Sequence, residues 1–380
     1  MSTEQSKRHY LDHNATSPVR PEVAQAVMDA MLLDGNSSSV HEEGRGARGR
    51  VESAREKVRT LVNAPVGGVI FTSGGTESIH YALHGAARAG LAKKIFVSAV
   101  EHAAVPMNAA TTGLPVEVVP VTEDGVLDLG ALKEVVSRES EPFLFCLMLA
   151  NNETGAIQPV KEAGDIVHDA GGLFFVDAAQ AVGKIPVNFT MLGADMLALT
   201  GHKFGGPVGV GALVLNPNLA LEPIMRGGGH ESNRRAGTHN IPAIAGLGVA
   251  CDLAVDAIER QGEIAVLRDR CEAAAEGAGA RIWAKNVDRL PGTLCLTAPG
   301  FAGENQLMAM DLGGIAMSSG SACSSGKSKP SHVLSAMGCH DDDAKCGIRV
   351  SFGWSSTDED AAAFCEQWPA SYDRVRARAA

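Results

Sequence analysis

Residues 173–203 read LFFVDAAQAVGKIPVNFTMLGADMLALTGHK, and this stretch decides the fold class. It contains two short apolar runs, at 173–176 and 196–199, and each run ends in small and polar residues. Continuous apolar runs of this length are typical of strands that are buried on both faces of a sheet. The stretch therefore predicts two successive strands of a buried sheet, with polar side chains at their ends.

The same pattern continues on both sides of this stretch. Apolar runs that predict strands occupy 69–71, 94–98, 143–149 and 209–215, and helical patterns occupy 76–89 and 161–170. Buried strands that alternate with helices favour an α/β fold with a mostly parallel central sheet flanked by helices. Because ligands of such sheets bind beyond the carboxyl ends of the strands, the polar residues there are candidate site residues.

The last third of the chain has a different character. An Ala-rich amphipathic stretch over 243–275 precedes a region with predicted strands near 293–296 and 347–352. A length of 380 residues also favours two domains, at about 150 residues per domain. We expect a large domain over 15–250 and a smaller α+β domain made of 1–14 and 251–380.

Composition excludes several classes of protein. Hydrophobic residues make up 45% and charged residues 20% of the chain, which excludes a disordered protein. The formal net charge of −11 argues against nucleic acid and against an anionic membrane surface as partners. We find no apolar stretch near the roughly 20 residues that cross a bilayer and no secretory signal, so we expect no membrane association.

The eight cysteines predict neither disulfides nor a metal site. They form no CxxC pair, so we expect reduced thiols in a cytoplasmic protein. The nearest cluster has a spacing that is not typical of a structural zinc site, and we therefore expect no metal. Its members are Cys323, Cys339 and Cys346, with His332 and His340 between them.

Two strand ends carry the strongest chemical signals. Asp177 ends a buried run, where a carboxylate needs a cationic partner. Lys203 follows the next run beside glycines, where a lysine of lowered pKa can act as a Schiff-base amine. A surface ion pair is the commoner role for either residue alone. Their spacing of 26 residues on successive strands favours a shared site.

Other strand ends are also polar. Residues 72–78, TSGGTES, combine a glycine turn with a helix start and suit a phosphate group; the alternative is an ordinary helix with Thr76 as its N-cap. Residues 149–155, LANNETG, place two asparagines after a strand, and His102 follows another strand. A turn role for the asparagines and a structural role for the histidine are the alternatives.

Two long loops contain almost no apolar residues. Residues 226–240 read RGGGHESNRRAGTHN, and their three arginines and Thr238 suggest contacts to an anion across a subunit interface. Residues 318–328 read SSGSACSSGKS and predict a mobile loop whose Cys323 is a nucleophile or carrier, an incidental cysteine being the alternative. The GKS end does not fit a nucleotide-binding loop, because Gly320 lies one residue too far away.

Taken together, these motifs resemble the cysteine desulfurases of the NifS/IscS type, which are pyridoxal-phosphate enzymes of fold type I. The resemblance runs from YLDHNAT at 10–16 to RVSFG at 349–353, nearly the whole chain. Its intermediate landmarks, in order, are GNSSSVH, TSGGTES, EHAAV, ANNETG, VDAAQ, TGHK, RAGT and SSGSAC. The resemblance implies a large domain that binds the cofactor and a small domain that carries the catalytic cysteine on loop 318–328.

The resemblance also implies roles for individual residues. Lys203 matches the lysine that forms a Schiff base with the cofactor, and Asp177 matches the partner of its pyridinium nitrogen. Gln180 matches the hydrogen-bond partner of the phenolic oxygen. His102 matches the imidazole stacked on the ring and is a candidate for proton transfer. Cys323 matches the nucleophile.

Further residues match the binding groups of the family. Asn152, which also counts among the cofactor-binding residues, and Arg349 match the groups that hold the substrate carboxylate. Thr238 matches a phosphate contact from the other subunit of a homodimer. The phosphate contacts within one subunit are expected from Gly75, Thr76, Thr200 and His202.

The implied activity is conversion of L-cysteine to L-alanine, with transfer of the sulfur to Cys323 as a persulfide. The long polar loop favours a supply of sulfur to iron–sulfur cluster assembly, including that of nitrogen fixation, with a scaffold or another acceptor protein as partner. A selenocysteine lyase, another fold type I enzyme and a catalytically inactive scaffold are the alternatives. Ser37 departs from the pattern, because family members commonly have proline there.

Overall fold

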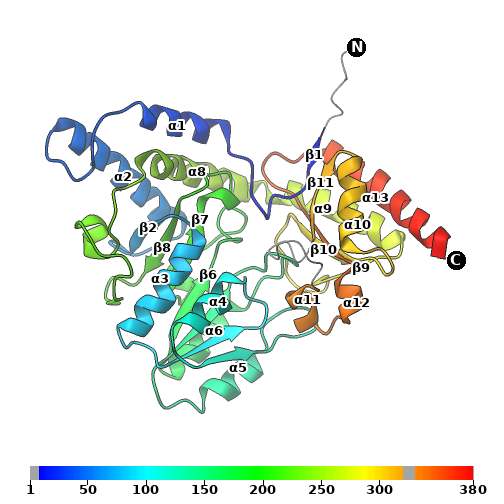
Figure 1. Ribbon diagram of the computed structural model, residues 1–380, viewed down its shortest axis with the longest axis horizontal. Coiled ribbons are helices and arrows are strands. Elements are labelled where there is room, and N and C mark those ends of the chain that lie inside the picture. The colour runs from blue at the N-terminus through cyan, green and yellow to red at the C-terminus, as the bar shows by residue number, and fades with distance from the viewer. Residues whose placement is uncertain (1–7, 320–329, 380) are drawn as a thin grey trace.

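The structure is a computed structural model that describes residues 8–319 and 330–379. A large part is built on a seven-stranded sheet, and a smaller part lies beside it (Figure 1). The smaller part contains both the strand β1 (His9–Tyr10) near the N-terminus and the helix α13 (Asp358–Ala379) at the C-terminus. The first strand and the last helix of the described residues therefore belong to the same part of the molecule.

The large sheet is made of β2 (Val69–Thr72), β3 (Lys94–Ser98), β4 (Val116–Val119), β5 (Phe143–Met148), β6 (Leu173–Asp177), β7 (Met196–Thr200) and β8 (Gly211–Leu215). Their order is β2-β8-β7-β6-β5-β3-β4. Neighbours from β4 to β7 are parallel, whereas β8 is antiparallel to β2 and to β7. The prediction of an α/β fold with a mostly parallel sheet is confirmed.

The apolar runs of the sequence form strands whose ends lie close to the predicted ones. The edge strand β4 was not predicted, because its sequence VEVV is no continuous buried run. Val116 and Val118 are 39% and 58% exposed at this edge. An edge strand packs on fewer neighbours than a central strand, so its hydrophobic signal in the sequence is weaker.

Helices cover both faces of the large sheet. The helices α3 (Gly75–Arg88) and α4 (Ala104–Thr111) pack against Met196 and Ala198 of β7 and against the same face of its neighbours. Leu197 and Leu199 point to the opposite face. That face is covered by α2 (Glu42–Leu61), α5 (Leu129–Val136), α6 (Val160–Asp169), α7 (Phe189–Leu192) and α8 (Ile241–Glu259).

Helix α8 is long and apolar enough to cross a membrane by length and composition, which the sequence analysis did not expect. In the structure it packs against α2 and against α1 (Pro21–Met31), as Figure 1 also shows. Its buried side chains, such as Leu247 and Ile244, belong to the core of the large part. The core helix of a soluble protein passes the same test, so this feature is weak evidence for a membrane.

The smaller part contains a four-stranded antiparallel sheet in the order β12-β13-β10-β9. These strands are β9 (Arg281–Ile282), β10 (Thr293–Thr297), β12 (Ser318–Ser319) and β13 (Gly347–Ser351), and β1 pairs with β11 (Ile315–Ala316) beside them. The helices of this part are α9 (Gln261–Gly277), α10 (Gly303–Leu312), α11 (His332–Ala336), α12 (Asp341–Ala344) and α13.

The Ala-rich stretch over 243–275 forms two helices, because the chain turns at Arg260 between α8 and α9. Cys251 and Ala254 pack in the core of the large part, although the predicted division at residue 250 assigns them to the small domain. The division stays a prediction, and this packing favours a boundary at the end of α8.

We expect Leu199→Ala to lower the free energy of unfolding by about 2–5 kcal/mol, because the variant leaves a cavity in the core. Leu199 is fully buried in β7. Val118→Ala on the exposed edge is the control, with an expected loss below about 1 kcal/mol. Urea unfolding followed by far-UV circular dichroism measures both, and equal losses would contradict this account of the core.

Candidate active site

One cavity opens at the carboxyl edge of the large sheet, where β5, β6 and β7 end. Its volume is about 250 Å³, and strand ends together with the start of α3 line it. Nine residues that the sequence analysis selected lie in its wall, namely Gly75, Thr76, His102, Asn152, Asp177, Gln180, Thr200, His202 and Lys203. The cavity therefore collects the predicted residues from several separate motifs.

The sheet topology explains this convergence. Asp177 is the last residue of β6, and Met148 at the end of β5 is its register partner. Thr200 ends β7, and the short 3-10 turn η1 (Gly201–Lys203) follows directly. Because neighbouring parallel strands end at the same edge, Asp177 and Lys203 reach one cavity despite their separation in the sequence.

Asp177 is a carboxylate with only 5% of its surface exposed. The backbone N–H of Ala179 donates a hydrogen bond to its Oδ1 at 2.9 Å. Burial raises the pKa of Asp177, whereas the Ala179 N–H, His102 and Lys203 act in the opposite direction. A cation placed in the cavity would therefore stabilise the charged carboxylate.

Lys203 joins the cavity to the N-terminal segment. Its Nζ donates to the backbone carbonyl oxygens of Asn14 at 2.6 Å and Ala15 at 3.0 Å. Both acceptors are uncharged, so these two bonds orient the amine without forming an ion pair. The amine thus lies at the cavity wall and is held there by hydrogen bonds to a distant part of the chain.

His102 is oriented by its own loop. The backbone N–H of Ala104 donates to Nδ1 at 3.2 Å, so the proton of the neutral ring resides on Nε2. Burial lowers the pKa of His102; Asp177 opposes this effect, and Lys203 and His332 add to it. The imidazole is therefore neutral at pH 7.

The start of α3 forms the polar end of the cavity. Gly74 is the N-cap, at a φ of +153° that favours glycine, so the alternative of an ordinary helix with Thr76 as its N-cap is wrong. A Cβ on Gly74 would lie 3.7 Å from the hydroxyl oxygen of Thr200. A side chain would fit there, so the positive φ is what favours glycine; the Thr200 hydroxyl lies beside the first turn of α3, an arrangement that suits an anion.

His202 lies at the same end of the cavity. Its Nδ1 is 3.1 Å from the hydroxyl oxygen of Thr16. Burial, and next the charges of Lys203 and Lys184, lower the pKa of His202 to about 4. The ring is therefore neutral at pH 7 in the protein alone, and an anion beside it would favour its protonation.

The two asparagines of the ANNETG motif have different roles. Asn151 is fully buried, and its Oδ1 accepts hydrogen bonds from the backbone N–H groups of Glu153 and Thr154. It therefore fulfils the alternative of a turn-forming residue. Asn152 instead lines the cavity. Sequence alone did not separate these neighbours, because both follow the same strand.

Arg349 lies behind Asn152 and is not among the residues that line the cavity. Its Nη1 donates to the backbone oxygen of Asn152 at 2.9 Å, and its Nη2 forms an ion pair with Asp12 at 2.8 Å. Its Nε is buried and finds no hydrogen-bond partner among the described residues. One donor of the guanidinium is therefore unsatisfied next to the proposed carboxylate site.

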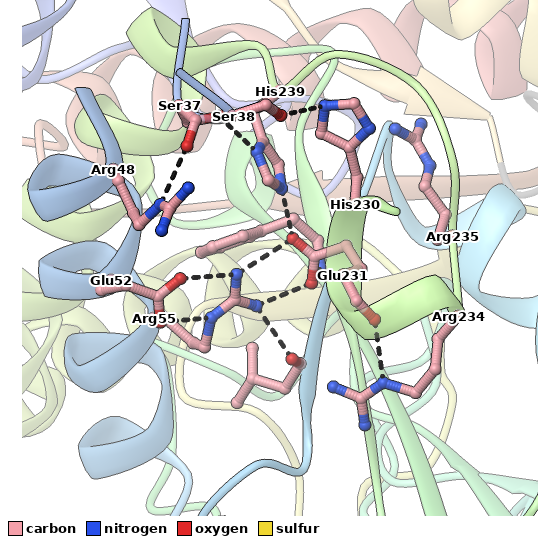
Figure 2. A network of polar contacts seen from close by, with 12 residues as sticks. Ser37, Ser38, Arg48, Glu52, Arg55, His230, Glu231, Arg234, Arg235 and His239 are labelled. Carbon is pink, nitrogen blue, oxygen red and sulfur yellow. Dashed lines mark hydrogen bonds and ion pairs between the residues drawn. The ribbon is translucent and has the colours of Figure 1, made fainter. Parts of the chain in front are cut away.

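Loop 226–240 is fixed through Glu231, whose side chain is 1% exposed. Its carboxylate accepts hydrogen bonds from Arg55 at 2.7 Å and from His239 at 2.5 Å (Figure 2). Although burial opposes it, the hydrogen bonds from His239 and Arg55 lower the pKa of Glu231 to about 2. This network attaches the loop to α2, and Ser37 takes part through its hydroxyl contact with His239 at 2.9 Å.

Thr238 is exposed on this loop and does not line the cavity of its own chain. The hollow beside the loop, about 780 Å³ in volume, is a separate surface feature lined by Arg48, Arg55 and other residues of the network. Cys323 lies outside the described residues. Thr238 is therefore absent from the cavity that holds Lys203.

Asn14 is a site residue to which the sequence analysis gave no role. It is 1% exposed; its backbone oxygen accepts from Lys203 and from Gln180, the latter at 2.9 Å. Its side chain donates to the Thr293 hydroxyl at 2.9 Å and accepts from Lys184 at 2.7 Å. The only signal in the sequence was its place in the YLDHNAT motif.

The donor set fits pyridoxal phosphate. The cavity offers a buried carboxylate for a ring nitrogen, an amine for a Schiff base and an amide, that of Gln180, for a phenolic oxygen. The open start of α3, with the Thr200 hydroxyl, suits the phosphate. These groups are distinct in chemistry and surround one space, so the fit follows from the residues themselves.

Comparisons with known proteins agree with this arrangement. The class-V aminotransferase family matches residues 9–364. A cysteine desulfurase of Cereibacter sphaeroides is 40% identical over 98% of this chain and 97% of its own length. An IscS-like cysteine desulfurase of Mycobacterium tuberculosis is 38% identical over 97% of each chain.

Solved structures give the same result. A NifS-like protein of Rickettsia africae superposes with a TM-score of 0.89 at 33% identity, over 96% of this chain and 99% of its own. A protein described as SspA in complex with cysteine superposes with a TM-score of 0.80 at 27% identity, over 92% and 100%. The resemblance inferred from the motifs is confirmed. The chain belongs to the class-V aminotransferase family of pyridoxal-phosphate enzymes.

Proposed function

We propose that the protein is a cysteine desulfurase that converts L-cysteine to L-alanine and transfers the sulfur to Cys323. The cavity that brings together Lys203, Asp177 and His102 carries this proposal. Relatives named cysteine desulfurase, similar over nearly their whole length, support it. So does the structural neighbour that was described with bound cysteine.

Bound in this cavity, pyridoxal phosphate supplies an electron sink that makes the Cα proton of an amino acid acidic. Asp177 would hold the ring nitrogen protonated, because its buried carboxylate favours a cationic partner. Lys203 would hold the cofactor through Nζ and, once released from it, would remove the Cα proton. Its Nζ also donates to the neutral backbone oxygens of Asn14 and Ala15, which orient the amine at the cavity wall.

His102 handles a proton near the substrate thiol. Its neutral ring carries the proton on Nε2, because Nδ1 accepts the Ala104 N–H. Burial lowers its pKa and so favours the neutral ring, whose Nδ1 is occupied and whose Nε2 carries the proton that can be transferred.

Asn152 and Arg349 hold the substrate carboxylate. The Asn152 side chain is at the cavity wall, and the unsatisfied Arg349 Nε lies behind it. An anion that reached this donor would satisfy a buried group that otherwise costs free energy. Arg349 is already oriented by Asp12, so little conformational entropy is lost when the carboxylate binds.

Cys323 completes the reaction as a thiolate that attacks the substrate sulfur. An S–S bond forms as the C–S bond breaks, the electron pair stays with carbon, and protonation gives alanine. The described residues on both sides of the segment contact Arg349 or a neighbour of Asn152. Ser318 is the register partner of Arg349, and the Ser331 hydroxyl donates to Glu153, the neighbour of Asn152.

The active unit we propose is a homodimer. Thr238 is exposed and lies outside the cavity of its own chain, while the Glu231 network fixes its loop in one conformation. A fixed, exposed hydroxyl is suited to complete the phosphate site of a second copy.

L-cysteine is the substrate, and an iron–sulfur scaffold or another acceptor protein takes the sulfur. The free cysteines among the described residues support a reducing compartment, and we propose the cytoplasm.

We expect Cys323→Ala to bind L-cysteine but to lose alanine formation by a hundredfold or more, on the order of the loss of a nucleophile. The assay measures alanine and sulfide from L-cysteine with excess dithiothreitol, where the intact protein gives equal amounts. Cys365→Ser is the matched control, a partly exposed thiol on α13. Full activity of the Cys323 variant would refute the persulfide assignment. Faster turnover of selenocysteine by both forms would favour a selenocysteine lyase.

We expect Lys203→Ala to bind the cofactor without a covalent bond and to lose alanine formation by roughly 10²–10⁴-fold. Borohydride reduction followed by mass spectrometry of the denatured chain detects the bond in the intact protein. Lys161→Ala, at an exposed lysine on α6 that pairs with Asp165, should behave like the intact protein. A cofactor adduct at another lysine would show that the amine is misassigned.

We expect Thr238→Val to raise the dissociation constant of pyridoxal phosphate by about tenfold, the effect of one hydrogen bond to a charged group. Size-exclusion chromatography with light scattering should show an unchanged dimer. Thr190→Val on α7 is the control, also at an exposed threonine. A monomeric intact protein with full affinity for the cofactor would disprove the role of a second subunit.

A further inference from the structure

A second lysine lies behind the cavity and has no part in the function described above. Lys184 lies four residues after Gln180, in the segment between β6 and β7. Its Nζ donates to Gln180 Oε1 at 2.7 Å and to Asn14 Oδ1 at 2.7 Å. It does not line the cavity of about 250 Å³, although it lines, together with Lys203, a smaller neighbouring cavity of about 20 Å³. Lys184 therefore acts on groups of the site rather than on a ligand.

Two partners orient the Gln180 amide. Its oxygen accepts a hydrogen bond from Lys184, and its nitrogen faces a backbone oxygen that can only accept. Gln180 Nε2 then points away from Lys184 and donates to the backbone oxygen of Asn14 at 2.9 Å. That same oxygen accepts from Lys203 at 2.6 Å. The donor atom of Gln180 thus lies on the side of the reactive amine.

The surroundings of Lys184 disfavour a positive charge on its side chain. Burial lowers the pKa of Lys184 well below its usual value, and the charges of Lys203 and Arg349 lower it further. Burial, and next the charge of Lys184, lower the pKa of His13 to about 3. His202 faces the same group of positive charges. No ion pair between Lys184 and a carboxylate is found in the described part of the chain. Packing alone would favour an apolar side chain at this position.

We propose that Lys184 is a positioning residue that fixes Gln180 with its Nε2 toward the cofactor bound at Lys203. The inference rests on the proposed function only in taking pyridoxal phosphate as the occupant of the cavity. Without Lys184, only the bond to the backbone oxygen of Asn14 holds the Gln180 amide, and its Nε2 is less well placed to donate to the phenolic oxygen. The hydrogen bond to the phenolic oxygen would then weaken, and the Schiff-base proton that it shares would be held more tightly.

The experiment follows the visible absorption of the reconstituted protein as a function of pH. We expect Lys184→Met to raise the pKa of the spectral transition by about 0.5–1 unit, and the dissociation constant of the cofactor by about fivefold, the effect of one weakened hydrogen bond. Lys184→Arg keeps the donors and should restore the spectrum. Lys161→Met, at the exposed lysine on α6, should change neither quantity.

The double variant tests whether Lys184 acts through Gln180. Gln180→Leu should give the same shift as Lys184→Met, and adding Lys184→Met to it should give no further shift. If Lys184→Met causes the same shift with Gln180 present and with Gln180→Leu, the lysine acts directly through its charge and the proposal is overturned. An unchanged spectrum in Lys184→Met would overturn it as well. If the methionine variant does not fold, Lys184→Gln replaces it, because its amide can face Gln180 with either atom, and the same shift is expected.

The failure of this proposal can be told from the failure of the proposed function. The spectral transition depends on the bound cofactor and on no substrate, so it is measured without L-cysteine. A protein that forms no alanine but shows the shift would refute the desulfurase and leave Lys184 as a positioning residue. If the intact protein and the Lys184 variants all form alanine equally well and show no spectral shift, the desulfurase assignment stands and the role of Lys184 is refuted.

Discussion

A buried carboxylate at the end of a parallel strand is the constraint on which the site depends. Asp177 loses most of its hydration in the fold, and a charge there is costly unless other groups compensate it. The Ala179 N–H, His102 and Lys203 each favour the charged form. A cationic ring nitrogen would favour the charged form further. Binding of the cofactor and the stability of the site are therefore coupled.

The second constraint is that the site spans both parts of the molecule. Asn14 precedes the large part in sequence, yet its backbone oxygen supports Lys203 and Gln180, and its side chain contacts Thr293 of β10. Arg349 of β13 reaches the loop that carries Asn152. Any movement of the smaller part relative to the large sheet would move these supports. The geometry around the amine thus depends on the docking of the two parts.

Much of the fold could be predicted from the sequence, because central strands are buried on both faces and leave continuous apolar runs. The edge strand β4 could not, since its alternating VEVV pattern also suits an exposed segment. Asn151 and Asn152 show the same limit within the site. Both are asparagines after one strand, and only their hydrogen bonds separate the turn former from the cavity residue. The charge effects between Lys184 and His202 likewise require distances that no pattern contains.

The sequence by itself determined the chemical types: a carboxylate and an amine at the ends of successive strands, a glycine turn before a helix, and a cysteine in a polar loop. Parallel strands must end at a common edge, so these types already predicted a shared site. Tertiary structure alone decided which groups support them. Asn14, Lys184 and Arg349 come from segments far apart in the chain, and their roles follow from hydrogen bonds formed only when those segments pack together. Local sequence determines strand and turn, whereas contacts between distant segments depend on the packing of the whole chain.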